Sequence, residues 1–289
     1  MTLLTLSQAL HQAESRGLNR LDAQWLLLHA LGKPTHERAW LLAHDTDKLP
    51  APVQAALDAA VQRRAAGEPL AYITGRQEFY DLDLRVDPRV LVPRPDTETL
   101  VDWALAVLDA ASVEQTLTQA PTLRALDLGT GSGAIALALK ATRPTLDVSA
   151  VDYSFDALAV AQANAQRLGL ALQWHQGSWL AALPQPTAGF DLIVSNPPYI
   201  AAQDEHLADL THEPLQALAS GVDGLDDIRQ IITQAPAYLH PGGWLLLEHG
   251  YDQAATVRAL LLKAGLEEVQ SRHDLSGIER CSGGRRAPD

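Results

Sequence analysis

The sequence has little of several residue types, and each shortage excludes a class of protein. Cys281 is the only cysteine among the 289 residues, so an intramolecular disulfide and a thiolate metal cage are both excluded. The chain has no apolar run of the roughly 18 residues that a membrane-spanning helix needs. Residues Met1–Leu10 lack a basic cluster ahead of an apolar stretch, unlike a secretory signal. We therefore expect a cytoplasmic protein with no membrane partner.

Positive charge is scarce as well. The chain carries 22 Lys and Arg against 35 Asp and Glu, a formal net charge of -13. Binding of nucleic acid through many phosphate contacts depends on clustered Lys and Arg, so we expect no direct nucleic-acid binding. The 10 His residues are scattered without a metal-ligand spacing, and we expect no metal.

The length of the chain predicts one main core and a smaller second domain. Residues 1–74 have helical patterns, with apolar positions at spacings of three and four in Leu6–Ala13 and Leu21–Leu31 and a further helix ending at Gly67. We expect a small helical bundle that recognises a large partner. From Ala71 the pattern changes to β-branched and aromatic residues between Gly and Pro, which predicts an extended or hairpin connector, placed at residues 75–95.

Strand and helix patterns then alternate through residues 96–289, which predicts an α/β domain with a mostly parallel sheet. We expect the terminal residues 283–289 to be mobile. The expected helices are Val101–Leu108, Ala134–Lys140, Phe155–Leu168, Asp226–Ala235 and Gln253–Ala264, and the expected strands are Leu123–Leu128, Asp147–Val151, Asp191–Ser195, Trp244–Glu248 and an extended stretch from Glu267.

A glycine-rich loop follows the first of these strands and opens a helix, as a loop that binds a nucleotide does. It runs from Asp127 through Gly129-Thr130-Gly131-Ser132-Gly133. Asp152 ends the next strand, where a carboxylate can accept hydrogen bonds from two ribose hydroxyls. The loop lacks the lysine and hydroxyl of a P-loop. NAD or FAD, S-adenosylmethionine, and a purely structural turn all remain open from this motif alone.

A rigid turn, Asn196-Pro197-Pro198-Tyr199, follows a buried strand at the edge of the sheet where open α/β sheets bind ligands. A planar NH2 group is a poor nucleophile, so an enzyme must orient it through both hydrogens. The Asn196 side-chain oxygen and the Pro197 carbonyl are two suitable acceptors, and Tyr199 can pack on a flat group. The alternative is an ordinary loop, because Asn-Pro and Pro-Pro are common in turns.

The two motifs together resemble class I methyltransferases that modify planar amino groups, which act on adenine, cytosine or protein glutamine. Further segments are similar to the release factor glutamine N5-methyltransferase family, the HemK or PrmC proteins. These segments are Gly67–Ile73, Phe79, Leu91–Glu98, Glu213-Pro214, Ala217-Leu218, Asp223–Leu225 with Arg229, and Glu248 with Gly250 and Gln253. Departures are Asp96, where the family often has Glu, and Gly177-Ser178, where an acid is common.

This resemblance implies a Rossmann-like, seven-stranded methyltransferase domain joined by a hairpin connector to an N-terminal helical domain. It implies S-adenosylmethionine as methyl donor and, as substrate, the glutamine of the Gly-Gly-Gln loop of a peptide chain release factor. Amino-group methylation of nucleic acid and a non-catalytic scaffold are the alternatives. The implied cofactor-binding residues are Asp127, Gly129, Thr130, Gly131, Ser132, Gly133, Asp152, Trp179 and Asn196; the implied catalytic residues are Asn196, Pro197 and Tyr199, with Pro198, Arg94 and Glu98 also binding substrate.

Overall fold

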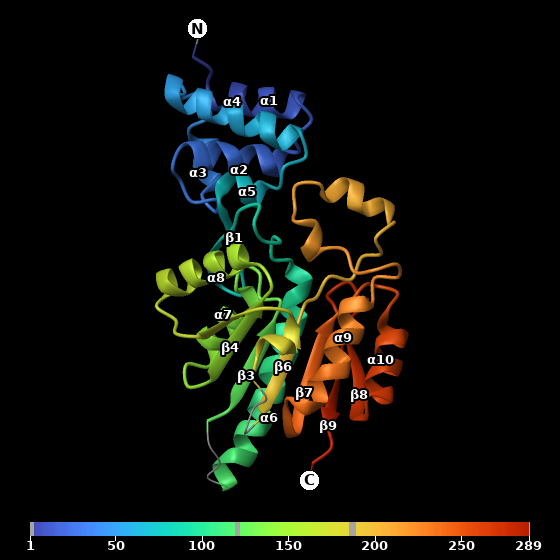
Figure 1. Cartoon of the computed structure of the whole chain (residues 1–289). Coiled ribbons are helices and arrows are strands. Elements are labelled where there is room, and N and C mark those ends of the chain that lie inside the picture. The colour runs from blue at the N-terminus through green and yellow to red at the C-terminus, as the bar shows by residue number, and fades with distance from the viewer. Residues whose placement is uncertain (1–2, 119–121, 185–188, 289) are drawn as a thin grey trace. The chain divides into compact units, whose positions relative to one another are not determined.

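The computed structural model describes residues 3–118, 122–184 and 189–288, which divide into two compact units, Met1–Arg76 and Gln77–Asp289 (Figure 1). The first unit is a helical bundle around Leu26, Leu27 and Leu28, none of which is exposed. Its helices are α1 (Leu6–Ser15), α2 (Arg20–Ala30), α3 (Arg38–Ala43), α4 (Ala51–Ala65) and α5 (Leu70–Thr74).

Local sequence explains where several of these helices begin and end. The Thr5 side chain accepts from the Gln8 backbone while the Gln8 side chain accepts from the Thr5 backbone, a reciprocal cap on α1. Pro69 precedes α5, and Gly75 ends it with a φ of 70°. The expectation of an extended chain from Ala71 was therefore wrong at its start, because the flanking proline and glycine confine one short helix.

A hairpin of β1 (Arg76–Phe79) and β2 (Leu82–Arg85) follows, and all of it after Arg76 belongs to the second unit. Tyr80 and Asp81 at its tip both have positive φ, the backbone twist that closes tight hairpins. Phe79 and Leu84 are buried in the core of this unit. A short 3-10 helix, η1 (Pro95–Thr97), then leads into α6 (Glu98–Thr118).

The centre of the unit is a seven-stranded sheet in the order β5-β4-β3-β6-β7-β9-β8. Its first five strands pair in parallel, and β9 pairs antiparallel with both β7 and β8. This confirms the predicted Rossmann-like α/β class. The strands are β3 (Arg124–Leu128), β4 (Asp147–Asp152), β5 (Gln173–Gln176), β6 (Phe190–Ser195), β7 (Leu239–Glu248), β8 (Leu266–His273) and β9 (Glu279–Arg286).

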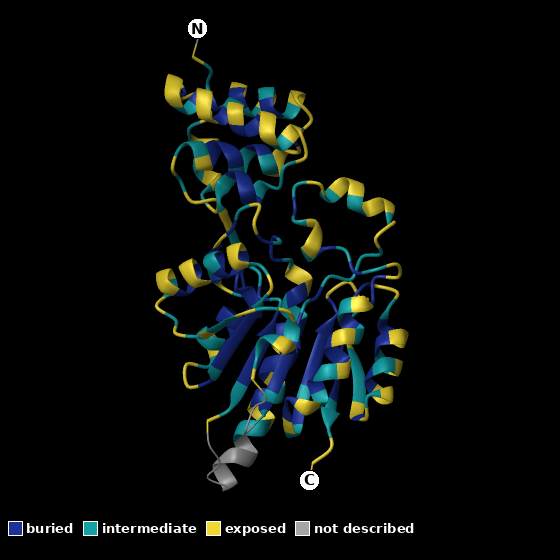
Figure 2. Ribbon diagram, in the orientation of Figure 1, coloured by how far each residue is buried: buried dark blue, intermediate teal, exposed yellow. Residues whose placement is uncertain are grey.

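Helices cover both faces of the sheet, and its central strands are buried (Figure 2). Side chains alternate along a strand, so Ala125 joins one apolar core with α6 and α7 whereas Leu126 joins the other with α9 and α10. The remaining helical segments are α7 (Ala134–Thr142), α8 (Phe155–Leu168), η2 (Trp179–Ala182), η3 (Glu205–Leu210), η4 (Leu215–Ala217), α9 (Asp226–Gln234), η5 (Ala235–Ala237) and α10 (Ala254–Lys263).

The C-terminal residues are more ordered than expected. Residues 283–286 belong to β9, so the prediction of a mobile tail was wrong for them, and Asp289 lies outside the described residues. A Cβ on Gly283 would lie 2.7 Å from the Leu245 carbonyl oxygen, and one on Gly284 would lie 3.0 Å from Leu266 Cβ. The glycines are needed because the strand passes so close to both neighbours.

Among the described residues, no helix is both long and apolar enough to span a membrane. The same residues include no cluster of three or more His, Cys, Asp and Glu side chains arranged to hold a metal ion.

Candidate active site

A pocket lies at the carboxyl ends of β3, β4 and β6. The strand order reverses at β3, whose neighbours are β4 and β6, and open α/β sheets bind ligands at such a point. The pocket brings together six of the predicted site residues, Gly129, Gly131, Asp152, Trp179, Asn196 and Pro198. It also includes residues that the sequence analysis did not name, among them Arg89, Val90, Gln216 and Asp227.

The glycine loop turns sharply beneath the pocket. The backbone N–H groups of Gly129 and Thr130 both donate to the Val151 carbonyl, at 2.8 and 3.0 Å, which ties the loop to β4. Gly129 has a φ of 71°, and a Cβ there would lie 3.1 Å from the Trp179 ring. Gly133, with a φ of 86°, caps α7. The loop therefore requires glycine for its backbone conformation and for its close approach to Trp179.

Asp127 lies behind this loop and is 1% exposed. Its Oδ2 accepts from the Thr130 hydroxyl at 2.7 Å and from the Ala136 backbone N–H at 3.2 Å. No described group hydrogen-bonds to its Oδ1. Burial raises the pKa of Asp127 to about 7, although the Thr130 and Ala136 bonds oppose that rise. Ser132 is also buried, and its carbonyl accepts from Asn164 at 3.0 Å.

Asp152 borders the pocket at the end of β4. Its Oδ2 accepts from the Gly131 backbone N–H, and its Oδ1 accepts from the Ser154 backbone N–H, each at 2.8 Å. Burial raises the pKa of this carboxyl, and both backbone hydrogen bonds lower it. Asp152 thus links the glycine loop to the start of α8 while it faces the pocket.

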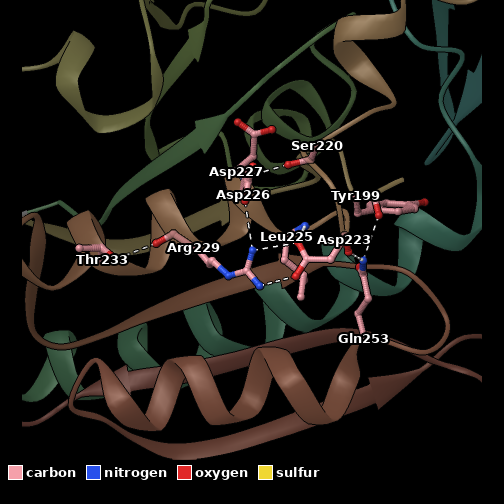
Figure 3. Close-up of polar contacts among 9 residues, drawn as sticks. All are labelled: Tyr199, Ser220, Asp223, Leu225, Asp226, Asp227, Arg229, Thr233 and Gln253. Atoms are coloured by element: carbon pink, nitrogen blue, oxygen red, sulfur yellow. Dashed lines mark hydrogen bonds and ion pairs between the residues drawn. The ribbon is translucent and has the colours of Figure 1, made fainter. Parts of the chain in front are cut away.

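Trp179 is held in place by a residue far away in the sequence. Its indole Nε1 donates to Asp227 Oδ1 at 3.0 Å, and Asp227 lies on α9. The Asp227 backbone N–H in turn donates to the Ser220 hydroxyl at 2.9 Å (Figure 3). Trp179 has a φ of 48°, a conformation unusual for a bulky side chain, which marks a backbone constrained by its surroundings.

The Asn196 turn is attached to β3 and to η1. Ser195, at the end of β6, donates through its hydroxyl to the Leu128 carbonyl at 2.6 Å. Asn196 Nδ2 donates to Thr97 Oγ1 at 3.2 Å. The Tyr199 hydroxyl donates to Glu248 Oε1 at 3.3 Å, and burial together with the Glu248 carboxyl raises the pKa of Tyr199 well above its usual range. Tyr199 is therefore a neutral phenol at ordinary pH.

Gln253 holds the far end of the turn (Figure 3). Its Nε2 donates to the Tyr199 carbonyl at 3.0 Å and to the Asp223 carbonyl at 3.4 Å. Its Oε1 accepts from the Gly250 backbone N–H at 2.8 Å. These three hydrogen bonds make the Gln253 side chain a clamp on the turn. A Cβ on Gly224 would lie 2.8 Å from Gln253 Nε2, so the position beside this clamp requires glycine. One side chain thus fixes three loops at the edge of the sheet.

Arg94 and Glu98, predicted at the substrate entrance, make contacts of their own. Arg94 forms an ion pair with Glu213, whose Oε2 also accepts from the Val92 backbone N–H at 3.1 Å. Glu98 Oε1 accepts from the Tyr80 backbone N–H at 3.0 Å, at the tip of the hairpin. The Arg94–Glu213 pair connects residues 92–94 to the loop that contains Pro214 and Ala217, which line the pocket.

Several structurally important residues were missed or given no role by the sequence analysis. Thr97, Glu213, Asp227 and Glu248 each contact a predicted site residue through a single hydrogen bond or ion pair. The family resemblance was the one available signal, because its segments contain Thr97, Glu213, Glu248 and Gln253. Nothing in local spacing indicated Asp227, because its partner Trp179 lies in a distant segment.

Two family descriptions match this chain. The description "PrmC N-terminal domain" matches residues 3–75, and "Methyltransferase small domain" matches residues 105–270. A methyltransferase structure from Pyrococcus furiosus has a TM-score of 0.50 at 17% identity, over 80% of this chain and 98% of that chain. The hMettl16 catalytic domain solved with a 3′UTR hairpin has a TM-score of 0.56 at 15% identity, over 83% and 84%. These structures share the fold, which by itself does not decide the substrate.

Curated relatives are much more similar in sequence. The release factor glutamine methyltransferase of Bordetella pertussis is 51% identical over 270 residues, which cover 93% of this chain and 95% of the relative. The protein of the same name from Xylella fastidiosa strain Temecula1 is 48% identical over 280 residues, covering 96% and 97%. That from Pseudomonas aeruginosa is 48% identical over 269 residues, covering 92% of each. With identity this high over almost the whole length, the chain belongs to the release factor glutamine methyltransferase family.

Proposed function

We propose that this protein transfers the methyl group of S-adenosylmethionine to the side-chain amide nitrogen, N5, of the glutamine in the Gly-Gly-Gln loop of a peptide chain release factor. The observation that carries this proposal is the meeting of Asn196 and Pro198 with Gly129, Gly131 and Asp152 around one pocket. An acceptor for a planar NH2 group and a nucleoside-type loop thus border the same space.

The residues of the loop side fit the methyl donor. Asp152 is the acceptor that the ribose hydroxyls require, and the Trp179 ring offers an apolar face for the adenine. Asp127 lies behind the loop Gly129–Gly133, and its Oδ1 has no hydrogen-bond partner among the described residues. This carboxyl and the loop together suit the cationic methionine end of the donor. When bound, S-adenosylmethionine supplies a methyl carbon on a positively charged sulfur.

The turn side fits the glutamine. The Asn196 side-chain oxygen and the Pro197 carbonyl accept one hydrogen each from the substrate NH2, which aims the nitrogen lone pair at the methyl carbon. Pro197 and Pro198 restrict the backbone of the turn. We assign Tyr199 to pack against the flat amide; its side chain is partly buried, and its hydroxyl donates to Glu248.

The chemistry requires alignment rather than a strong base. The nitrogen–carbon bond forms as the carbon–sulfur bond breaks, and the electron pair of that bond stays on sulfur. The methylated nitrogen then releases one proton to water, so charge and atoms balance. Arg94 and Glu98 are assigned to the substrate entrance, where Arg94 acts together with Glu213.

We assign substrate recognition to the helical domain, residues 1–74, with residues 75–95 as its connector and residues 96–289 as the methyltransferase domain. The match of residues 3–75 to a description specific to this family supports a dedicated role for the helices. Release factors are large protein substrates, and a second domain extends the surface that can distinguish them from other proteins.

Transfer of a labelled methyl group tests the proposal. Purified protein and methyl-labelled S-adenosylmethionine are incubated with a release factor, with the same factor carrying Gln→Ala in its Gly-Gly-Gln loop, and with ribosomal RNA. We expect label on the intact factor alone. Label on the RNA alone would favour the nucleic-acid alternative, whereas equal label on both factors would move the target away from the loop glutamine.

A further inference from the structure

The Asn196 side chain can serve the substrate in one of its two orientations. An amide presents an acceptor, Oδ1, at one end and a donor, Nδ2, at the other, and a half-turn of the group exchanges them. A substrate NH2 group needs the acceptor, because two donors facing each other would leave both unpaired and repelling. A neighbouring group in the protein must therefore hold the Asn196 amide in the orientation that presents Oδ1 to the substrate.

The neighbour of Asn196 is Thr97, which is 4% exposed at the end of η1. Asn196 Nδ2 donates to Thr97 Oγ1 at 3.2 Å. A hydroxyl has one hydrogen and accepts through its lone pairs. Thr97 therefore accepts from Nδ2 as long as its own hydrogen is directed to another group.

That other group is Glu248, the last residue of β7, which is 1% exposed. Its Oε1 accepts from the Tyr199 hydroxyl at 3.3 Å. In the described part of the chain, no hydrogen bond of good geometry reaches its Oε2. The neighbouring Thr97 hydroxyl can supply one: burial raises the pKa of the Glu248 carboxyl, and hydrogen bonding from the Thr97 side chain lowers it. An ionised carboxylate only accepts hydrogen bonds.

A nearby cation favours the ionised form. Burial raises the pKa of Glu248 to about 7, and the charge of Arg280 on β9 opposes that rise. Arg280 is anchored by ion pairs with Asp274 at 3.3 Å and Asp96 at 3.6 Å. Glu248, Thr97 and Asn196 thus form a chain from a buried acceptor to the edge of the pocket, where Asn196 is a lining residue.

We propose that Glu248, acting through the Thr97 hydroxyl, fixes the Asn196 amide so that its Oδ1 faces the substrate nitrogen. Glu248 accepts from Thr97, Thr97 accepts from Asn196 Nδ2, and Oδ1 is left as the end that meets the glutamine. Thr97 and Glu248 are positioning residues in this scheme, which rests on the proposed glutamine methylation. Glu248 also holds Tyr199, so one carboxylate orients two residues of the turn.

The test compares Thr97→Val, which keeps the shape without the hydroxyl, with Thr97→Ser, which keeps the hydroxyl. We expect Thr97→Val to lower kcat roughly tenfold or more while the Kd for S-adenosylmethionine and the unfolding midpoint stay close to those of the parent. Thr97→Ser should retain kcat within about threefold. Equal activity of the two variants, whether both high or both low, would overturn the proposal.

A second measurement separates orientation from packing. Binding is measured for the release factor and for its Gln→Glu loop variant, whose carboxylate presents only acceptors. In Thr97→Val and Glu248→Leu, which lacks an acceptor for the Thr97 hydroxyl, a freed Asn196 can turn its Nδ2 to that carboxylate. The preference for the glutamine loop over the glutamate loop should therefore fall by roughly three- to tenfold, the equivalent of one hydrogen bond, and not in Thr97→Ser. An unchanged preference in folded Glu248→Leu would overturn the proposal even if Thr97→Val fails to fold.

The parent enzyme distinguishes this failure from failure of the proposed function. If the parent protein does not methylate a release factor, the glutamine activity itself is wrong. If the parent methylates the loop glutamine and Thr97→Val does so at the same rate, the activity stands and the orienting chain is wrong.

Discussion

Two buried carboxylates, Asp127 and Glu248, stand behind the two halves of the site. Each is 1% exposed, each has one oxygen that no described group hydrogen-bonds, and burial raises the pKa of each to about 7. They differ in what they support. Asp127 bonds the glycine loop through Thr130, whereas Glu248 bonds the Asn196 turn through Tyr199.

The halves meet between the neighbouring strands β3 and β6, where the Ser195 hydroxyl donates to the Leu128 carbonyl at 2.6 Å. We infer a division of labour: the loop half holds the methyl donor and the turn half orients the methyl acceptor. On this account, substitutions in the loop half should change the affinity for the donor, and substitutions in the turn half should change the rate of transfer.

The largest effect is expected from Asn196→Ala, which removes the side-chain acceptor from the turn half. We expect kcat to fall roughly hundredfold, as when one preorganised hydrogen-bonding group is removed from an active site. The Kd for S-adenosylmethionine, measured by calorimetry, should change by less than about threefold. Single-turnover methyl transfer provides the rate. Full activity in this variant would break the comparison and favour a scaffold.

Asp152→Ala should act on the loop half. Loss of a charged hydrogen-bonding partner costs about 1.5–3 kcal/mol, so we expect the Kd for S-adenosylmethionine to rise roughly tenfold to a hundredfold. Asp152→Asn is the matched control, because it retains an oxygen for the Gly131 or Ser154 backbone N–H. At saturating donor, kcat should stay within about threefold of the parent. A lower kcat with unchanged Kd would contradict the division.

The pH dependence of kcat should sharpen the comparison. The pKa of Glu248 is raised to about 7, so this carboxyl is protonated below that pH and ionised above it. A protonated carboxyl can donate to Thr97 and release Asn196, so kcat should rise as pH increases through about 7. In Glu248→Gln the part of that rise due to Glu248 should disappear.

The titratable and charged groups that face Glu248 support the assignment of this rise in kcat to the Glu248 carboxyl. Arg280 favours the ionised form, Asp96 opposes it, and the neutral Tyr199 donates to it. Cys281 on β9 has a raised pKa because of burial, so it stays a thiol through this range. Asp127 also has a pKa of about 7, so a residual rise in Glu248→Gln belongs to the loop half. An identical profile in parent and variant would contradict the role of Glu248.

The smallest effect concerns the clamp at the end of the turn. Gln253→Ala removes the hydrogen bonds to the Tyr199 and Asp223 carbonyls and to the Gly250 N–H, and should lower the free energy of unfolding by about 1–3 kcal/mol. Arg229→Gln is the control, because its ion pair with Asp223 is between largely exposed side chains and is worth about 0–1 kcal/mol. Urea unfolding measures both. Equal destabilisation would show that Gln253 has no special role.

Periodic patterns predicted most of the fold, and departures from them explain the errors. The helix Phe155–Leu168 was located to the residue, whereas β7 begins at Leu239, earlier than the predicted Trp244. Strand β5, Gln173–Gln176, was missed because it lies at an edge of the sheet and its sequence has no apolar alternation. β9 was missed because Gly283 and Gly284 resemble a loop until the neighbouring strands are known.

The site was predictable where its residues are adjacent in the chain. The glycine loop and the Asn196 turn are continuous motifs, and Gly129, Gly131 and Asn196 do border one pocket. The supporting residues could not be located in this way. Thr97 contacts Asn196 across 99 positions and Trp179 contacts Asp227 across 48, distances that no local pattern encodes. Folding, rather than spacing, brings such pairs together.

The most direct test of the central claim is to locate the methyl group on its substrate atom. A release factor is incubated with this protein and S-adenosylmethionine, digested, and fragmented in a mass spectrometer, with the Asn196→Ala enzyme in parallel. We predict one methyl group on the side-chain nitrogen of the loop glutamine with the parent enzyme and almost none with the variant. A methyl group on another residue, or equal methylation by the variant, would contradict the account.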